Sequence, residues 1–520
     1  MTRKYSCVDL FSGCGGLSLG LKSSGFDTRL AVEKSDMAAE TYFHNFIGRI
    51  SDLDCWRRDF LQSSVSDQAK KHLVVRELEQ VLKAEDVMDS LRSEGIDLIA
   101  GGPPCQGFSM AGRRNPDDVR NELPWQFLEF VKAVQPRAVI IENVSGMRSD
   151  FNKYGKKSPF EELGQALSET GPGYVVQPML LNARHFGVAQ NRPRLFLAAI
   201  SLEVALSLYP LLGDRLTACV LDPWDSSWET PTTPALASLI PQPGQFGVEG
   251  RSPKSRRPVL APSRTHFPFG MKDTNGERTV AAALAGLSGP ERNTPVGQTD
   301  YGLQLAKLAQ HLQPQLKSGL ANHGFRNHSE KVERRFAFYQ WASEQGIPKQ
   351  ILSIPKKPGL SERQIDAEIR SLVDGLVVYP AVVQTGSGPR GRHWILMDED
   401  ALIREVKVLA TKKHSQRALR NDEPAPTVVS LPDDFVHPTE CRVPTVRELA
   451  RFQSFPDEFE FRAKETTGAD RRRVEVPQFT QVGNAVPPLL AQALGRHLHG
   501  LLERADQFRE EGQATIKTVA

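Results

Sequence analysis

Short apolar runs, separated by glycine-bearing loops and amphipathic stretches, organise the first 200 residues of the chain. The runs of buried-strand type are 5–10, 30–32, 96–100, 138–141 and 195–200. Continuous rather than alternating apolar runs are typical of parallel strands covered on both faces. Residues 123–134 instead repeat their apolar positions with helical period, and Pro136 ends that helix. The pattern predicts an α/β fold of Rossmann-like type.

The second half of the chain has a less regular pattern of apolar residues. Residues 200–262 lose periodicity and gain prolines, which indicates a boundary and linker. Farther on, 377–384 and 393–397 resemble two strands joined by the glycine-rich, arginine-bearing loop 385–392. Such a loop suits a reader of DNA bases, because arginine forms paired hydrogen bonds with guanine, although a plain hairpin turn is the better explanation of any one of these residues.

The last part of the chain returns to regular patterns. Thr445 and Glu448 have capping-box spacing, so a helix should begin there. Residues 481–488 are expected to form a loop before a helix that packs on the first domain through the stripe Leu490, Leu494, His497, Leu498 and Leu501. We therefore expect domains at 1–235, 236–436 and 437–505, the last returning to the first, with a frayed tail at 506–520.

The composition of the chain limits its possible functions but does not identify one. The 520 residues carry 65 Lys and Arg against 62 Asp and Glu, so any nucleic-acid surface must be local. The six cysteines show no CxxC spacing, which argues against a structural zinc site or a disulfide framework and for a reducing compartment. No apolar stretch approaches the length of a membrane span, and no signal peptide is evident. We expect a soluble cytoplasmic protein without a metal.

A glycine loop follows the first strand. Gly13, Gly15 and Gly16 would let the backbone approach a ligand, and Glu33 follows about twenty residues later, at the spacing of a carboxylate that binds ribose hydroxyls. The loop lacks the GxGxxG pattern, so a nucleoside without a pyrophosphate fits better than a dinucleotide. The alternative is a structural turn that closes a helix on the sheet. Asp59 and Phe60 follow a third short segment and are a candidate contact for an adenine amino group.

Cys105 is the centre of the second candidate site. It follows Pro103 and Pro104, which stiffen the loop after the strand 96–100 and hold the thiol at the carboxyl edge of the sheet. The functional interpretation is a nucleophile, and the structural one is a small cysteine in a proline turn.

Two further strand ends carry charge. Glu142 ends an apolar run, so it is either paired or has a raised pKa and acts as an acid. Arg192 and Arg194 precede the strand 195–200, and alternation would place both on one face, where they suit an anionic or carbonyl-bearing partner. A surface ion pair is the alternative for these arginines.

These elements together resemble the DNA cytosine-5 methyltransferase family. The matching motifs, in the family's order, are DLFSGCGG at 9–16, Glu33, GGPPCQGFS at 101–109, ENV at 142–144, QNRPR at 190–194, TVRELARFQSFPD at 445–457 and QVGNAVPP at 481–488. The resemblance implies a Rossmann-like S-adenosylmethionine-dependent methyltransferase domain with a smaller target-recognition domain across a DNA-binding cleft.

The resemblance also implies roles. Cys105 would add to cytosine C6, Glu142 would hold the N3 edge of the flipped base, and Arg192 would contact the base carbonyl with support from Arg194. The residues expected to bind S-adenosyl-L-methionine are Phe11, Gly13, Cys14, Gly15, Gly16, Leu17, Glu33, Asp59, Phe60, Pro103, Asn484 and Val486.

The partner implied is double-stranded DNA, bound by a monomer, in a bacterial restriction-modification or phage-defence system. Two alternatives remain. One is a methyltransferase acting on cytosine in transfer RNA, and the other is a non-catalytic DNA-binding regulator with the same fold.

Overall fold

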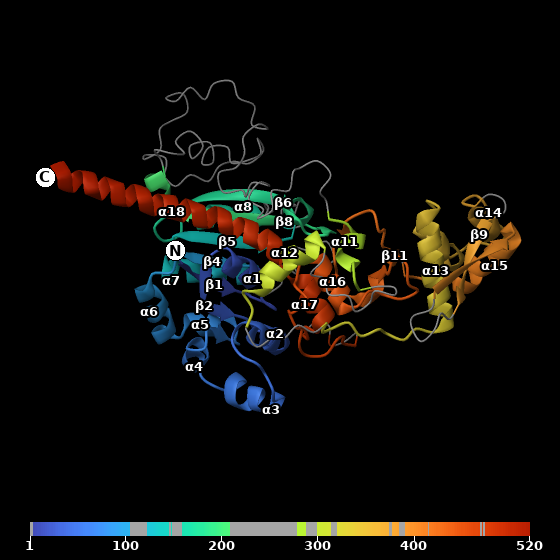
Figure 1. The fold of residues 1–520 in the computed structure, drawn as a ribbon, viewed down its shortest axis with the longest axis horizontal. Helices are drawn as coiled ribbons and strands as arrows, with labels where there is room; N and C mark the ends of the chain where they lie inside the picture. The colour runs from blue at the N-terminus through green and yellow to red at the C-terminus, as the bar shows by residue number, and fades with distance from the viewer. Residues whose placement is uncertain are drawn as a thin grey trace, which may run out of the picture.

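The structure is a computed structural model of the chain (Figure 1). It describes residues 4–104, 122–144, 147, 159–208, 278–287, 299–313, 320–373, 377–383, 391–413, 415–468, 471 and 474–519. Cys105 and most of the arginine-bearing loop 385–392 lie outside these ranges, as does the whole proline-rich stretch 209–277.

A seven-stranded sheet forms the centre of the larger part of the molecule. Its strands are β1 (Tyr5–Leu10), β2 (Phe26–Val32), β3 (Leu73–Val74), β4 (Leu98–Gly101), β5 (Ala138–Asn143), β6 (Tyr174–Asn182) and β8 (Pro193–Ser201), in the order β3-β2-β1-β4-β5-β8-β6. The first five strands in that order, from β3 through β2, β1 and β4 to β5, pair in parallel. Strand β8 pairs antiparallel with both β5 and β6. The Rossmann-like α/β prediction is confirmed, with one antiparallel strand that the apolar runs did not reveal.

Helices cover both faces of this sheet, as the continuous apolar runs require. In β5, Ile140 belongs to one buried cluster and Ile141 to the other, because successive side chains point to opposite faces. One face is covered by α5 (Leu78–Leu82), α6 (Glu85–Glu94), α7 (Leu123–Val134) and α8 (Pro159–Ser168). The other is covered by α1 (Gly16–Ser23), α11 (Val280–Leu284), α12 (Asp300–Ala309) and α18 (Pro488–Val519).

The contact between α1 and α18 brings distant parts of the chain together. A Cβ atom added at Gly20 would lie 2.4 Å from the Ala491 Cβ and 2.4 Å from the Pro488 carbonyl oxygen, so the two helices touch through backbone. Leu490, Leu494 and Leu498 are buried in the same cluster, which confirms the predicted docking of this helix. The helix continues to Val519, where a frayed tail was expected, because a helix anchored by packing propagates easily through residues without proline.

A second hydrophobic core lies at the far end of the molecule from the end of α18 (Figure 1). It is built from α13 (Glu330–Glu344), η10 (Lys349–Lys356), α14 (Glu362–Arg370), β9 (Val377–Val383), β10 (Gly391–Met397) and α15 (Glu399–Leu409). The predicted strands β9 and β10 are confirmed as an antiparallel pair. The helices α11 and α12, which lie within the range 236–436 expected for the second domain, pack on the first core.

Short elements complete the chain. They are α2 (Asp36–Phe46), α3 (Leu53–Cys55), the π-helix η1 (Trp56–Leu61), α4 (Val65–Ala69), η5 (Ala183–Phe186), β7 (Gln190–Asn191), β11 (Arg417–Ala418), β12 (Ala425–Pro426), η11 (Pro432–Asp434), β13 (Phe435–Val436), α16 (Val446–Phe452) and α17 (Gln478–Asn484). The capping box at Thr445 and Glu448 is confirmed. Half of the expected loop 481–488 is instead the end of α17, because Phe479 and Val482 bury one helical face. None of the helices in the described ranges combines the length and apolar character that a bilayer span requires.

Candidate functional site

The candidate site lies at one edge of the sheet, where several chain segments meet. Parallel strands β1, β2, β4 and β5 all end at this edge, and β8 begins there because it runs antiparallel, with Leu195 opposite Asn143. The glycine loop, Glu33, the loop leading to Cys105, Glu142 and the arginine segment are therefore brought to a common rim. This is the edge at which open α/β sheets bind ligands.

Glu33 ties the glycine loop to the second strand. Its Oε2 accepts a hydrogen bond from the Gly13 backbone nitrogen at 2.8 Å, and its Oε1 accepts one from the Ser35 nitrogen at 2.7 Å. Burial raises the pKa of Glu33, and these backbone hydrogen bonds oppose the rise. Each carboxylate oxygen has a second lone pair, so the group can still accept a hydrogen bond from a ligand hydroxyl.

The part of the chain that returns to the sheet (residues 437–505, the return segment) packs against the glycine loop. Gly15 has a φ of +98°, which favours glycine, and a Cβ at Gly16 would lie 2.3 Å from the Val486 carbonyl oxygen. Two segments expected to bind one cofactor are thus in direct contact, although they are far apart in the chain. Asn484, at the end of α17, is exposed beside them.

Not every residue of the glycine motif faces a ligand. Cys14 is buried, its thiol donates to the Gln481 carbonyl at 3.8 Å, and burial raises its pKa to about 12. Leu17 is buried in the hydrophobic core, and Phe11 is partly buried against the opposite cluster. Cys14 and Leu17 therefore act mainly through packing.

Asp59 and Phe60 do not lie at the rim. They belong to the π-helix η1, where the Phe60 ring stacks on Trp56 at 4.5 Å and the exposed Asp59 pairs with Arg58. The third strand of the sheet is β3, and Glu33 donates its backbone nitrogen to the Val74 carbonyl there. The short segment before Asp59 is therefore helical and is not part of the sheet.

The loop toward Cys105 lies against the end of β5. A Cβ at Gly102 would be 3.0 Å from Glu142 Oε2, and the Pro103 carbonyl accepts a hydrogen bond from Asn143 Nδ2 at 3.3 Å. Asn143 was not singled out from the sequence, although it stands within the quoted ENV motif. The described part of this loop ends at Pro104, one residue before the cysteine.

Glu142 pairs with Arg194 rather than with Arg192. Arg194 Nε lies 3.0 Å from Glu142 Oε1, and both side chains are nearly buried, at 13% and 12% exposure. Burial raises the pKa of Glu142, while the guanidiniums of Arg194 and Arg192 oppose the rise. The carboxyl is therefore displaced toward its neutral form but held by a cation.

Arg192 departs from its expected position. Its guanidinium is buried and donates to the carbonyls of Val428 at 3.2 Å, Gly483 at 2.8 Å and Ala485 at 3.0 Å. Burial lowers its pKa well below the ordinary value, and Arg194 lowers it further. Alternation along the strand placed both arginines on one side but could not show which one would be enclosed by the return segment.

Gln190 is a second residue that links the first half of the chain to the return segment, and the sequence did not single it out. Its Nε2 donates to Gln453 Oε1 at 3.0 Å, and its Oε1 accepts from the Val428 nitrogen at 2.8 Å. The signal was present in the QNRPR motif, where only the arginines were considered. The motif therefore joins the first half of the chain to the return segment.

The chain was compared with known proteins. The family model described as C-5 cytosine-specific DNA methylase matches residues 5–218 and 303–500. Similar relatives include the type II methyltransferase M.DdeI of Desulfomicrobium norvegicum, 27% identical over 98% of this chain and 92% of the relative. The type II methyltransferase M.AgeI of Thalassovita gelatinovora is 28% identical over 94% of this chain and 97% of the relative.

Proposed function

The chain belongs to the C-5 cytosine-specific DNA methylase family, so its reaction is methyl transfer to C5 of cytosine in DNA, and we propose how its residues perform that reaction. The proposed substrate is one cytosine within a specific double-stranded sequence, and the proposed donor is S-adenosyl-L-methionine. The similarity to two type II methyltransferases over nearly the whole chain supports a role as the modification enzyme of a restriction-modification system.

The proposed nucleophile is Cys105. Cytosine C5 is a weak nucleophile, and addition of the Cys105 thiolate to C6 turns C5 into an enamine carbon that can take the methyl group. Loss of the C5 proton then drives elimination, which breaks the sulfur–C6 bond and returns the thiolate. The target carbon is inaccessible inside a stacked duplex, so the base must be flipped into the site.

Glu142 and Arg194 are proposed to hold the flipped base. A carboxyl displaced toward its neutral form can donate a proton to N3 as negative charge develops on the ring. Arg194 stands against that carboxyl, so we assign the contact with the base carbonyl to Arg194. Arg192, which is committed to three backbone carbonyls, is assigned to holding the cofactor-side loop instead.

The glycine loop suits the proposed donor. Nothing lies within 4 Å of a Cβ added at Gly13, whereas the Glu33 carboxylate stands beside that open space. Glu33 can accept hydrogen bonds from ribose hydroxyls, and the exposed Asn484 borders the same loop. S-adenosylmethionine would supply an activated methyl group on a sulfonium, and these residues would orient it toward the base.

One observation carries the proposal: the Glu142–Arg194 pair lies against Gly102, three residues before Cys105. Incubation with methyl-labelled donor and either duplex DNA or transfer RNA tests it. Wild-type protein should label cytosine C5 in DNA only, and Cys105→Ala should lose about 10⁴-fold or more in rate while donor binding persists.

Two results would contradict this assignment. A Cys105→Ala rate near that of the wild type would remove the nucleophile role. Labelling of transfer RNA in preference to DNA would instead establish the RNA alternative. Bisulfite sequencing of DNA exposed to the protein would then identify the target sequence.

A further inference from the structure

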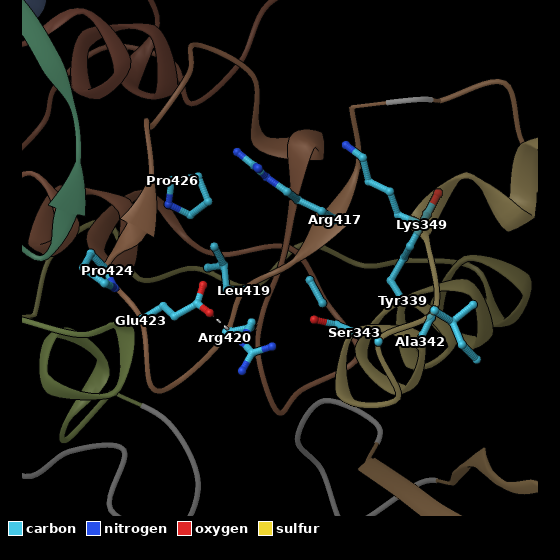
Figure 2. Close-up of a pocket in the computed structure, with 13 residues that line it drawn as sticks. Tyr339, Ala342, Ser343, Lys349, Arg417, Leu419, Arg420, Glu423, Pro424 and Pro426 are labelled. Atoms are coloured by element: carbon cyan, nitrogen blue, oxygen red, sulfur yellow. Dashed lines mark ion pairs between the residues drawn. The ribbon is translucent and has the colours of Figure 1, made fainter.

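A cavity of about 320 Å³ lies where the second unit, built around the second hydrophobic core, meets the chain that returns to the sheet (Figure 2). Tyr339, Ser343 and Lys349 line it from α13 and the start of η10. Arg417, Arg420 and Pro426 line it from the segment between β11 and β12. Both units therefore contribute to one concave surface.

Two cations on this surface have no ion-pair partner among the described residues. Lys349 contacts only the Ser415 carbonyl, at 3.4 Å, and the Arg417 guanidinium lies 5.6 Å from the centre of the Phe435 ring. Burial lowers the pKa of Lys349, and Arg417 lowers it further, so the two charges repel each other. Asp434 attracts both cations, but one of its oxygens already accepts from Ser415.

Arg420 lines the same cavity, but acidic side chains neutralise its charge. Its guanidinium pairs with Asp422 at 3.1 Å and with Glu423 at 3.0 Å. Figure 2 shows the Arg420–Glu423 pair, with Arg417 and Lys349 on another side of the cavity. The cavity thus holds one neutralised arginine and, among the described residues, two cations without an ion-pair partner, a combination that suits an anion more than a structural role.

The wall of this cavity is continuous with the catalytic rim. Pro426 belongs to β12, which pairs in parallel with β7 at Gln190 and Asn191. The next residue, Thr427, donates its hydroxyl to the Asn191 carbonyl at 2.8 Å. Asn191 is three residues before Arg194, the partner of Glu142, so an anion in the cavity is bound on a surface that leads directly to the base site.

We propose that Lys349 and Arg417 together bind a backbone phosphate of the DNA substrate, across the junction of the two units. The inference rests on the proposed action on duplex DNA and adds the place where the backbone is anchored. A phosphate there relieves the repulsion between the two cations and fixes the second unit against the sheet. Because every nucleotide carries the same phosphate, the contact contributes affinity and register but no base preference.

The test is the salt dependence of binding. Each phosphate contact by a cation contributes about 0.9 to the slope of log affinity against log salt. Fluorescence anisotropy with a labelled duplex should show a slope about one unit smaller for Lys349→Gln and for Arg417→Gln, and about two units smaller for the double variant. The loss should be equal on target and non-target duplexes.

Arg420→Gln is the matched control, because it removes a cation from the same cavity that acids already neutralise. Its slope should remain close to that of the wild type. The methylated sequence should be the same in all variants, and Arg420→Gln should also keep the methylation rate at saturating DNA. An unchanged slope in the double variant, or a loss confined to the target duplex, would overturn the inference.

Inorganic phosphate separates the two sources of the same chemistry. Inorganic phosphate could raise the unfolding temperature of the wild-type protein but not of the Lys349→Gln and Arg417→Gln variants. If the salt slope of DNA binding is the same in these variants as in the wild type, the cavity binds a small anion instead of the DNA backbone. The binding measurement does not depend on catalysis. A protein that binds DNA as described but transfers no methyl group would refute the proposed function and leave this inference standing.

Discussion

Two sets of cationic side chains differ in what their charge is used for. Arg192, Arg447 and Arg451 are buried, and each donates to two or three backbone carbonyls, at least one of which comes from a distant segment. Lys349 and Arg417 line an open cavity and have no acidic ion-pair partner among the described residues. The first set holds the frame of the enzyme together, and the second is left for a ligand, so an arginine within a motif need not contact the substrate.

The largest effect should come from removing a frame arginine. Arg192→Met removes the donor to three buried carbonyls, of which, among the described residues, only Ala485 keeps a further bond, from Gln453 Nε2 at 3.4 Å, and we expect the free energy of unfolding to fall by about 3 kcal/mol or more. Urea unfolding measures it. The matched change in the other set, Arg417→Gln, should alter it by about 0.5 kcal/mol or less. Equal unfolding midpoints for the two variants would erase the distinction between the sets.

A smaller effect should follow from disturbing the contact between the glycine loop and the return segment. Gly16→Ala places a methyl group against the Val486 carbonyl, which is backbone and moves only with its loop. We expect a cost of about 1–3 kcal/mol, shared between stability and S-adenosylmethionine affinity. Calorimetric titration with S-adenosylmethionine measures the loss of donor affinity.

The control is Gly500→Ala, in α18, where an added methyl group meets nothing. It should leave donor binding unchanged and raise stability by up to about 1 kcal/mol through helix propensity. If Gly16→Ala bound the donor as tightly as this control, the loop contact would have no part in the cofactor site.

The smallest effect should come from Asp59→Asn. The side chain is exposed and pairs with the neighbouring Arg58 within the same short helix, so we expect its charge to serve neither the frame nor the proposed ligands. Donor affinity should equal that of the wild type, whereas Glu33→Gln should weaken it. A clear loss of affinity in Asp59→Asn would return this residue to the adenine pocket.

Local patterns predicted the parts of the fold that depend on neighbours in the chain. The strand Tyr5–Leu10, the helix Leu123–Val134 and the capping box at Thr445 were all predicted at their observed places. Each depends on periodicity or on a hydrogen bond spanning three residues, so the sequence alone contains the information.

The errors arose where distant segments decide the outcome. Arg192 and Arg194 share a strand-end pattern, but only the return segment, nearly 300 residues later, determines which one it encloses. Asp59 lost its expected position because Trp56 and Phe60 stack in a helix. The cavity at Lys349 and Arg417 had no motif at all, since its residues come from separate units.

The contact between Gly16 and Val486 also has a consequence for biosynthesis. A growing chain emerges from the ribosome with its glycine loop early, but the carbonyl that closes on this loop is made some 470 residues later. Domains fold as they are completed during translation, so the first strands must wait for the return segment before a donor site exists. Translation products that stop short of α17 would therefore lack one side of the proposed donor site.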